Sequence, residues 1–247
     1  MPELPVSEPA VALEPAVALE PAGAAEALAL RPPLTAPLAR SPIAPAEPVT
    51  SVAGWQVSAV RAASPDLTLT DCTPLAKVAL AARCAEVYGV RFGRAARDPA
   101  GTLVVGSGPG EWLLIGPPGQ ARALTAGLEG LAGPDAPDDG ATWVDLTHGR
   151  ALVRLTGDRA AGVLAKLSAI DLGDDLVPDG AALRTAVAAV ATDVIRDDTG
   201  GTRSYLLHCE RSVGQYLFDA IVQAGAEFGI GVDGFRLPGP AVSQPVS

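Results

Sequence analysis

The sequence has few of the residues that usually build metal centres, disulfide frameworks or nucleophilic sites. Its three cysteines, Cys72, Cys84 and Cys209, are odd in number, form no CxxC pair and fit no zinc spacing. Its two histidines, His148 and His208, stand in no recognisable metal motif. These absences argue against a disulfide scaffold and against a zinc protein, and they favour reduced, mostly buried thiols.

Basic charge and long apolar runs are scarce as well. The 18 Lys and Arg residues face 28 Asp and Glu residues, which gives a formal net charge of −10. A nucleic-acid binder would need a basic stripe, so we expect no nucleic-acid partner. No apolar run reaches the ~18 residues of a membrane span, and no basic segment followed by an apolar core marks a signal peptide. We therefore expect a cytoplasmic protein without a membrane partner.

The N-terminal part differs in composition from the rest of the chain. The first 50 residues hold eleven of the 23 prolines and a six-residue repeat, which runs from Glu8 to Leu13 and again from Glu14. Proline at this density interrupts helices and sheet ladders, and alanine and valine are too small to pack a core. The sequence predicts a disordered tail over residues 1–60, a folded domain over 67–236 and a frayed end over 237–247.

The clearest local signal is a β-hairpin late in the chain. One apolar run ends at Ile195 and another begins at Tyr205. Between them, residues 197–201 read Asp-Asp-Thr-Gly-Gly, a turn in which glycine adopts positive φ at little steric cost. The preceding run, Leu183 to Ile195, fits a helix or a strand, and we favour one strand because it contains several valines and precedes a hairpin turn.

A helix is predicted directly after this hairpin. Ser212 and Gln215 have the spacing of a capping box, which marks a helix start. Gly225 stands where a left-handed C-cap belongs. The residues expected on the apolar face are Tyr216, Leu217, Ala220, Ile221 and Ala224.

An earlier segment repeats the same order of elements. Two apolar runs, 103–106 and 112–115, predict a hairpin, and the helix that follows would pack through Ala121, Leu124, Leu128 and Leu131. The glycine-rich joint at 106–110 leads into a strand rather than a helix, so it is not a phosphate loop. Together with strands at 77–80, 143–147 and 151–155, the order predicts an α+β fold. Its antiparallel or mixed sheets would have helices packed on one face, in repeated hairpin–helix units.

No catalytic set emerges from the candidate reactive residues. Cys209 and His208 are adjacent on a strand and point to opposite faces, so they cannot pair as nucleophile and base. Arginine and glutamate at strand ends form either solvated ion pairs or interface anchors, because arginine is enriched at binding hot spots. The candidates for partner contact are Arg150, Arg196, His208, Glu210 and Arg211.

Three pieces of the chain together resemble the gamma subunit of heterotetrameric sarcosine oxidases. They are Trp143 to Arg150, the helix opening at 155–158, and Arg184-Thr185 followed by Tyr205 to Leu207 and by Arg211-Ser212 with Tyr216-Leu217. The likeness spans roughly residues 67–231 and leaves out the N-terminal 60 or so. The motifs hold structural glycines, a Thr-x-Gly-Arg turn and an Arg-Ser helix cap, with no catalytic signature.

The resemblance implies a role inside a larger enzyme. Such complexes convert sarcosine, oxygen and tetrahydrofolate to glycine, methylenetetrahydrofolate and hydrogen peroxide. It implies alpha and beta partner subunits that carry FAD, FMN, NAD and folate, and a delta subunit that carries zinc. The gamma subunit resembles the folate-binding fold of the glycine-cleavage aminomethyltransferase and has no assigned catalytic residues. We therefore expect no cofactor in this chain and a non-catalytic, structural role.

One alternative from another class stays open. A freestanding folate-dependent aminomethyl transferase of similar fold would need a carboxylate in a cleft as its base. Asp145 or Asp171 would supply it.

Overall fold

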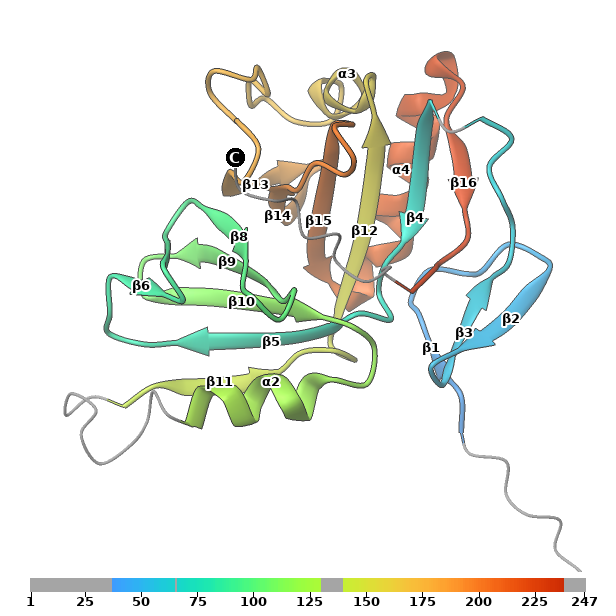
Figure 1. The fold of residues 1–247 in the computed structure, drawn as a ribbon. Helices are drawn as coiled ribbons and strands as arrows, with labels where there is room; N and C mark the ends of the chain where they lie inside the picture. Colours follow the sequence, from blue (N-terminus) through green and yellow to red (C-terminus); the bar gives the residue numbers. More distant parts are fainter. Residues whose placement is uncertain (1–36, 65, 130–139, 238–247) are drawn as a thin grey trace, which may run out of the picture. The chain divides into compact units, whose positions relative to one another are not determined.

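The computed structural model describes residues 37–64, 66–129 and 140–237, and two β-sheets form its body (Figure 1). The six-stranded sheet has the order β13-β14-β15-β12-β4-β16. β16 pairs with β4 in parallel, and the other neighbours are antiparallel. Its strands are β4 (Leu67–Asp71), β12 (Arg150–Gly157), β13 (Ala182–Val187), β14 (Val190–Arg196), β15 (Ser204–Glu210) and β16 (Gly231–Asp233).

The five-stranded sheet has the order β11-β5-β10-β9-β8, with antiparallel neighbours throughout. A separate two-stranded ribbon joins β6 (Glu86–Val87) to β7 (Val90–Arg91). The strands of the five-stranded sheet are β5 (Ala76–Ala81), β8 (Ala95–Arg97), β9 (Leu103–Gly108), β10 (Glu111–Gly116) and β11 (Thr142–Asp145).

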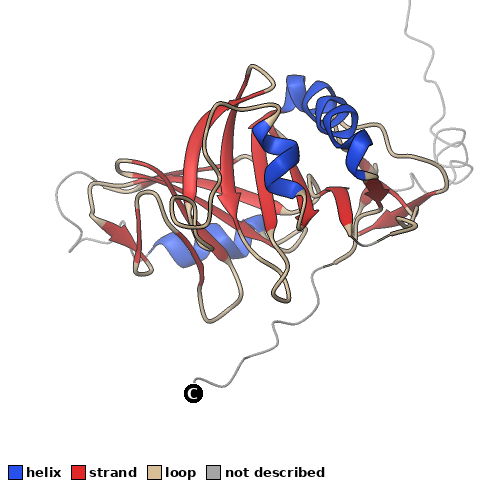
Figure 2. Ribbon diagram, turned by 90° about the horizontal axis from the view of Figure 1, so that it is seen from above, coloured by secondary structure: helices blue, strands red, loops and turns tan. Residues whose placement is uncertain are grey.

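Alternation along the strands sorts apolar side chains into three cores, because successive residues point to opposite faces. On β10, Leu113 and Ile115 pack between the two sheets, whereas Trp112 and Leu114 pack under α2 (Ala121–Leu128). On β15, Leu206 joins the core between the sheets. The opposite face of the six-stranded sheet is covered by α3 (Ala160–Ala165) and α4 (Gly214–Gly225), as Figures 1 and 2 show. Each sheet therefore has helices on one face, as predicted for an α+β fold.

The two predicted hairpin–helix units are both present. β9 and β10 form a hairpin that leads to α2, and β14 and β15 form one that leads to α4. Leu124 and Leu128 are buried on α2 as expected, while Leu131 lies outside the described residues. The predicted hairpin turn at 197–201 is confirmed by a bridge between Thr199 and Thr202.

The single strand predicted from Leu183 to Ile195 is wrong in one respect. The segment is two strands, β13 and β14, joined at Ala188 and Ala189. Both alanines have positive φ, 49° and 64°, as the tightest hairpin turns require. Such turns normally use asparagine or glycine, so the alanine pair gave no sign of a turn.

The predicted caps of α4 are also wrong. A short 3₁₀ helix, η2 (Arg211–Val213), precedes α4, and no side chain of the described residues caps the helix start. Instead of closing a capping box, Gln215 Oε1 accepts a hydrogen bond from the Ala44 backbone N–H at 2.7 Å. Gly225 has an ordinary helical φ of −83°, because a further 3₁₀ turn, η3 (Ala226–Phe228), carries the chain on to Gly229 at φ 70°.

The face of α4 that meets the sheet is shifted from the predicted one. Tyr216 was expected to be buried but is 57% exposed. Phe218, which was not expected there, is buried. The observed buried residues of α4 are Gly214, Leu217, Phe218, Ile221, Ala224 and Gly225.

The prediction of a disordered tail up to residue 60 is wrong for residues 39–58. A three-stranded sheet forms there from β1 (Ala39–Arg40), β2 (Val49–Val52) and β3 (Trp55–Ser58), in the order β1-β3-β2. Trp55 and Val57 alternate on β3 and pack into the core between the sheets. The repeat-bearing residues 1–36 and the end at 238–247 lie outside the described residues, so those parts of the prediction stay predictions.

Candidate ligand site between the two sheets

A cavity of about 570 Å³ opens beyond one end of the core between the sheets. On β5 the side chains that face this space are Ala79 and Ala81, since their neighbours Val78 and Leu80 point into or toward the core under α2. Alanine side chains are much smaller than leucine or isoleucine side chains, so Ala79 and Ala81 leave space for the cavity. The opposite wall comes from β12, β13, β14 and β15.

That opposite wall carries one row of polar side chains in register across neighbouring strands. Arg184 on β13 pairs with Asp193 on β14, and Asp193 pairs with His208 on β15. Arg184 Nε donates to Asp193 Oδ1 at 2.6 Å, and Asp193 Oδ2 lies 2.9 Å from His208 Nδ1. His208 is 5% exposed and Asp193 is 9% exposed. The row is thus an arginine–carboxylate–imidazole chain built into the sheet ladder.

The surroundings of Asp193 and His208 determine which of the two carries a proton at neutral pH. Burial acts to raise the pKa of Asp193, but the hydrogen bonds from His208 and Arg184 outweigh it and hold that pKa below its ordinary value of 3.8. Burial lowers the pKa of His208 below 6.5, and the bond to Asp193 offsets only part of this. At neutral pH the carboxylate is ionised and can only accept a hydrogen bond, so we assign the imidazole proton to Nδ1.

This assignment leaves His208 Nε2 as a hydrogen-bond acceptor. Within the described part of the chain, Nε2 is buried and has no hydrogen-bond partner. A buried acceptor without a partner costs about 1–3 kcal/mol. Such atoms are rare in folded proteins, and each calls for a functional or structural reason. His208 lines the cavity, but its Nε2 is buried and is not open to the cavity space.

Two ion pairs stand on the lining of the same cavity. Arg150 on β12 forms an ion pair with Glu210, its directly opposite neighbour on β15. Arg184 Nη1 also approaches Glu111 Oε2 on β10 at 3.4 Å, which links the two sheets. Three of the five predicted contact residues, Arg150, His208 and Glu210, therefore line one cavity.

The other two predicted contact residues have different surroundings. Arg196 is 7% exposed and its guanidinium is held by Asp174, Asp198 and the Val177 carbonyl oxygen. Arg211 lies nearer the surface and donates to the backbone oxygens of His148 and Arg40, at 3.3 and 2.7 Å.

Burial distinguishes two of the five expected contact residues from the other three. Arg196 and His208 are enclosed by their own chain, so neither presents its side chain to a partner surface. Arg196 fixes the loop before β13 to the end of β14 instead. Arg150, Glu210 and Arg211 keep enough exposure to remain predicted contacts.

The structure also shows where the residues considered as nucleophile or base lie. Cys209 packs in the core under the helices, on the face opposite His208, which confirms that the two cannot pair. Asp145 and Asp171 are exposed, and each accepts a hydrogen bond from a backbone N–H two residues on, at 2.8 and 2.9 Å. They stabilise turns and do not lie in a cleft, so neither fits the base of the alternative hypothesis. The carboxylate at a cavity wall is Asp193, which sequence reasoning passed over.

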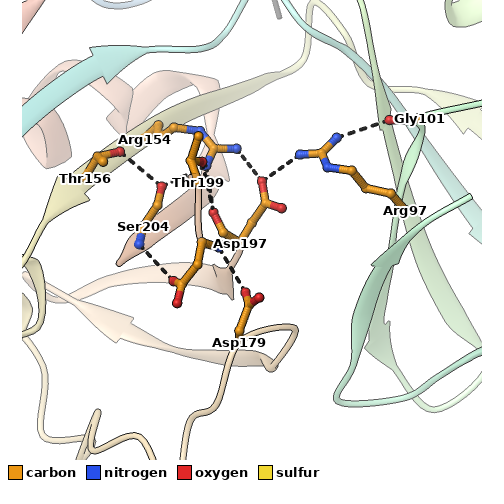
Figure 3. A network of polar contacts seen from close by, with 9 residues as sticks. Arg97, Gly101, Arg154, Thr156, Asp179, Asp197, Thr199 and Ser204 are labelled. Carbon is orange, nitrogen blue, oxygen red and sulfur yellow. Dashed lines mark hydrogen bonds and ion pairs between the residues drawn. The ribbon is translucent and has the colours of Figure 1, made fainter. Parts of the chain in front are cut away.

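A second cavity, of about 660 Å³, lies on another side of the inter-sheet core. Its lining includes Arg97 and Arg154, whose guanidinium groups converge on Asp197 Oδ2 at 2.7 and 2.5 Å (Figure 3). Arg154 also donates to Ser204 Oγ at 2.7 Å. These arginines are satisfied within the chain, so their network fixes the β14–β15 turn to β8 and β12. The cavity beside His208 is the stronger candidate because the charged side chains on its wall, Arg150, Arg184 and Glu210, remain partly exposed.

Two further searches of the described residues gave negative results. Within the described ranges, no group of three or more His, Cys, Asp or Glu residues is placed to hold a metal ion. No helix of the described part is both long enough and apolar enough to cross a membrane.

Comparison with known proteins first defines the class of fold. No protein-family model matches the sequence, and no curated protein matches it. Solved structures do match, and they identify an aminomethyltransferase-like α+β fold. The glycine cleavage system aminomethyltransferase T from Bartonella henselae superposes with a TM-score of 0.56 at 17% identity, over 75% of this chain and 55% of that one.

A second similar structure is a chain of a heterotetrameric enzyme. A chain of the heterotetrameric sarcosine oxidase from Corynebacterium sp. U-96, solved with pyrrole 2-carboxylate, superposes with a TM-score of 0.57 at 24% identity. The match covers 68% of this chain and 89% of that one. At these identities the two likenesses establish the fold.

Proposed function

We propose that this chain is a gamma-type, non-catalytic subunit of a sarcosine oxidase-like heterotetramer. The observation that carries the proposal is the extent of the structural match. It takes in 89% of the sarcosine oxidase chain but 55% of the aminomethyltransferase. The chain thus corresponds to nearly a whole chain of the oxidase and to about half of the transferase.

In this proposal the chemistry belongs to the partners. The alpha, beta and delta subunits would carry FAD, FMN, NAD, folate and zinc, and the complex would oxidise sarcosine. This chain would contribute contact surface through Arg150, Glu210 and Arg211. The Arg150–Glu210 pair is suited to that role, because the Glu210 side chain is 61% exposed and the Arg150 side chain 32%. A rim charge of this kind sets specificity and association rate more than affinity.

The test is purification of the tagged full-length chain from its native host under mild conditions. We expect larger flavin-containing chains to co-purify in fixed ratio, with sarcosine-dependent hydrogen peroxide production by the complex. Elution as a free monomer, with no flavoprotein attached, would overturn the proposal. Sarcosine turnover by the isolated chain would overturn the non-catalytic role.

A matched pair of variants locates the contact. Glu210 and Glu227 are both ion-paired glutamates, with side chains 61% and 60% exposed, on different parts of the surface. Glu210→Arg should weaken recovery of the partners at least about tenfold, equivalent to about 1.4 kcal/mol. Glu227→Arg should leave recovery unchanged. Equal recovery with both variants would exclude the Arg150–Glu210 rim as a contact.

A freestanding folate-dependent transferase remains the second candidate because one observation favours it. Asp193 is an ionised carboxylate on a cavity wall, which is the element that hypothesis lacked at Asp145 and Asp171. Reduced folate should then raise the melting temperature in a saturable way. Asp193→Asn should abolish that rise, whereas no shift at millimolar folate excludes the candidate.

A further inference from the structure

We propose that the second cavity, of about 660 Å³, binds a small carboxylate whose apolar body is about the size of a phenyl ring. This site is separate from the cavity beside His208, because the described lining residues of the two cavities have no member in common. The proposal does not rest on the subunit role, since every group involved belongs to this chain.

The anchor for the carboxylate is the guanidinium group of Arg236. Arg97 and Arg154 also line the cavity, but both are paired with Asp197 (Figure 3). Among the described residues, Arg236 has one ionic neighbour, Asp233, whose Oδ2 lies 3.6 Å from Nη2, beyond hydrogen-bond length. The Arg236 side chain is 61% exposed, so its N–H groups are open to a ligand in the cavity that it lines. They form a planar fork that matches the two oxygens of a carboxylate.

The sign of the charge also favours an anion. The lining side chains that are charged at neutral pH are three guanidinium groups, of Arg97, Arg154 and Arg236, and one carboxylate, of Asp233. Their sum is +2, and the Asp197 carboxylate that two of the arginines share lowers it to +1. The whole chain has a net charge of −10. A cleft with apolar walls concentrates the field of its own charges, so this cavity attracts an anion although the protein is acidic.

Two threonine hydroxyls on the same wall add hydrogen-bond donors. Thr68 and Thr70 on β4 both line the cavity, because residues two apart on a strand share a face. Thr70 lies opposite Arg154 on β12 and Asp233 on β16. Both threonines are half-buried, and neither hydroxyl has a hydrogen-bond partner among the described residues. A ligand oxygen can therefore accept from them.

The remaining wall is apolar and suits a ring. Leu103, Ile115, Leu206 and Phe235 line the cavity and belong to the core between the sheets. The volume is within the ~300–1,000 Å³ typical of small-molecule sites. Aromatic rings pack favourably against one another and against aliphatic groups. An aryl carboxylate therefore matches both walls, with its carboxylate toward Arg236 and its ring toward Phe235.

The experiment compares two ligands that share a ring and a three-carbon chain. One is 3-phenylpropanoate, and the other is the neutral alcohol 3-phenylpropan-1-ol. Titration calorimetry of the full-length chain at neutral pH and low salt should show the carboxylate binding about tenfold more tightly, a modest ratio because Arg236 is exposed. High salt should reduce this preference. Propanoate, which lacks the ring, should bind at least about tenfold more weakly than 3-phenylpropanoate.

Methyl NMR shows which cavity the ligand occupies. The Ile115 methyl signals should shift when 3-phenylpropanoate binds, and the Ala79 methyl signal should not. Ile115 lines the proposed site, whereas Ala79 lines the cavity beside His208.

The chain supplies a matched control for the anchor. Arg236→Gln should remove the preference for the carboxylate over the alcohol. Arg122→Gln should keep it, because Arg122 lies on α2 and lines neither cavity. Both arginines are exposed, so neither substitution threatens the fold, and both remove one positive charge. A difference between the two variants therefore reports on position and not on net charge.

Several results would overturn the proposal. They are equal affinity for the carboxylate and the alcohol, no binding of 3-phenylpropanoate at millimolar concentration, a preference that survives in Arg236→Gln, or a ligand that shifts Ala79 instead of Ile115. Each of these would leave the subunit role standing, since co-purification of partners is measured without any added carboxylate. Conversely, a free monomer that prefers 3-phenylpropanoate would retain the ligand site and exclude the subunit role.

Discussion

Asp193 and His208 lie directly opposite each other on adjacent antiparallel strands, with 2.9 Å between Asp193 Oδ2 and His208 Nδ1. Their meeting depends on strand register, because a slip of one residue turns every side chain to the other face of the sheet. In that case His208 would enter the core under the helices and Cys209 would face the cavity. The turn at 197–203 therefore sets the chemistry of the cavity wall as well as the fold.

Replacing the carboxylate should destabilise the fold. Asp193→Asn removes an ionised acceptor from both Arg184 and His208, so we expect the free energy of unfolding to fall by about 1–3 kcal/mol. Urea denaturation measures this change. Asp219→Asn is the control, because Asp219 is exposed on α4 and bonds only Gln215 among the contacts described. Equal losses in the two variants would show that the buried row contributes nothing.

The same pair predicts acid sensitivity in two stages. Both pKa values are lower in the folded state, below 6.5 for His208 and below 3.8 for Asp193. Between the folded-state pKa and the ordinary pKa of each group, the unfolded chain binds more protons than the folded chain. Each group's contribution to stability is therefore complete above its ordinary pKa and is lost as the pH falls through its folded-state pKa.

Urea denaturation from pH 8 to pH 3 checks this. The free energy of unfolding should begin to fall below about pH 6.5, since that is the ordinary pKa of histidine. His208→Phe should lack this first decline and keep a later one at lower pH. A flat profile in the native protein between pH 7 and pH 5 would contradict the buried, neutral imidazole.

The sequence predicted the β9–β10 and β14–β15 hairpins and the α+β class, but not the β13–β14 hairpin or the polar row that it forms. The β14–β15 turn was visible because it contains Gly200 and Gly201, whereas the β13–β14 turn at Ala188 and Ala189 has no such residue. Without that second turn, Arg184 and Asp193 are nine positions apart in one strand and cannot meet. Asp193 thus could not be recognised as the buried partner of a histidine fifteen residues away.

The N-terminal sheet was missed for a compositional reason. Eleven prolines and many small residues dominate the average over the first 50 positions, although β2 and β3 themselves contain no proline. Trp55 on β3 is a bulky aromatic residue in this region, and the structure buries it to 3% exposure. A single aromatic residue on an alternating strand outweighed the proline-rich average, because its burial stabilises more than a run of alanines.

The burial of Lys77 predicts that the stability of the fold changes at alkaline pH. It is fully buried, and burial lowers its pKa to about 8, although Asp71 acts in the opposite direction. Its Nζ donates to the carbonyl oxygens of Thr73 and Leu75 at 2.7 and 2.8 Å. The folded lysine therefore loses its proton before the unfolded one does, and its contribution to stability rises from pH 8 to the ordinary value of 10.5.

The measurement is the difference between the native protein and Lys77→Met. Burial raises the pKa of Cys72 and of Cys209 to about 11, so both thiols reduce stability above pH 9. Both proteins share that loss except for the charge interaction between Lys77 and Cys72, so the subtraction removes most of it. The difference should grow in favour of the native protein by about 3 kcal/mol between pH 8 and pH 10.5. A difference that stays constant with pH would show that Lys77 titrates normally.

The close chain crossing at Gly106 predicts a large effect of a single methyl group. A Cβ at Gly106 would lie 2.2 Å from the Arg91 carbonyl oxygen, where the segment after β7 bonds to β9 through Gly93 N–H and Gly106 O at 2.9 Å. The clash is with backbone, which cannot rotate away, so Gly106→Ala should lower the free energy of unfolding by about 1–3 kcal/mol or more. Gly127→Ala is the matched control on α2, because its Cβ would meet Tyr88 Oη at an ordinary 3.5 Å. Alanine in a helix is favoured over glycine by about 0.5–1 kcal/mol, so this variant should be as stable as the native protein or more so. Thermal and urea unfolding of the two variants should therefore move in opposite directions, and a shift of the same sign in both would contradict the close approach of β7 and β9.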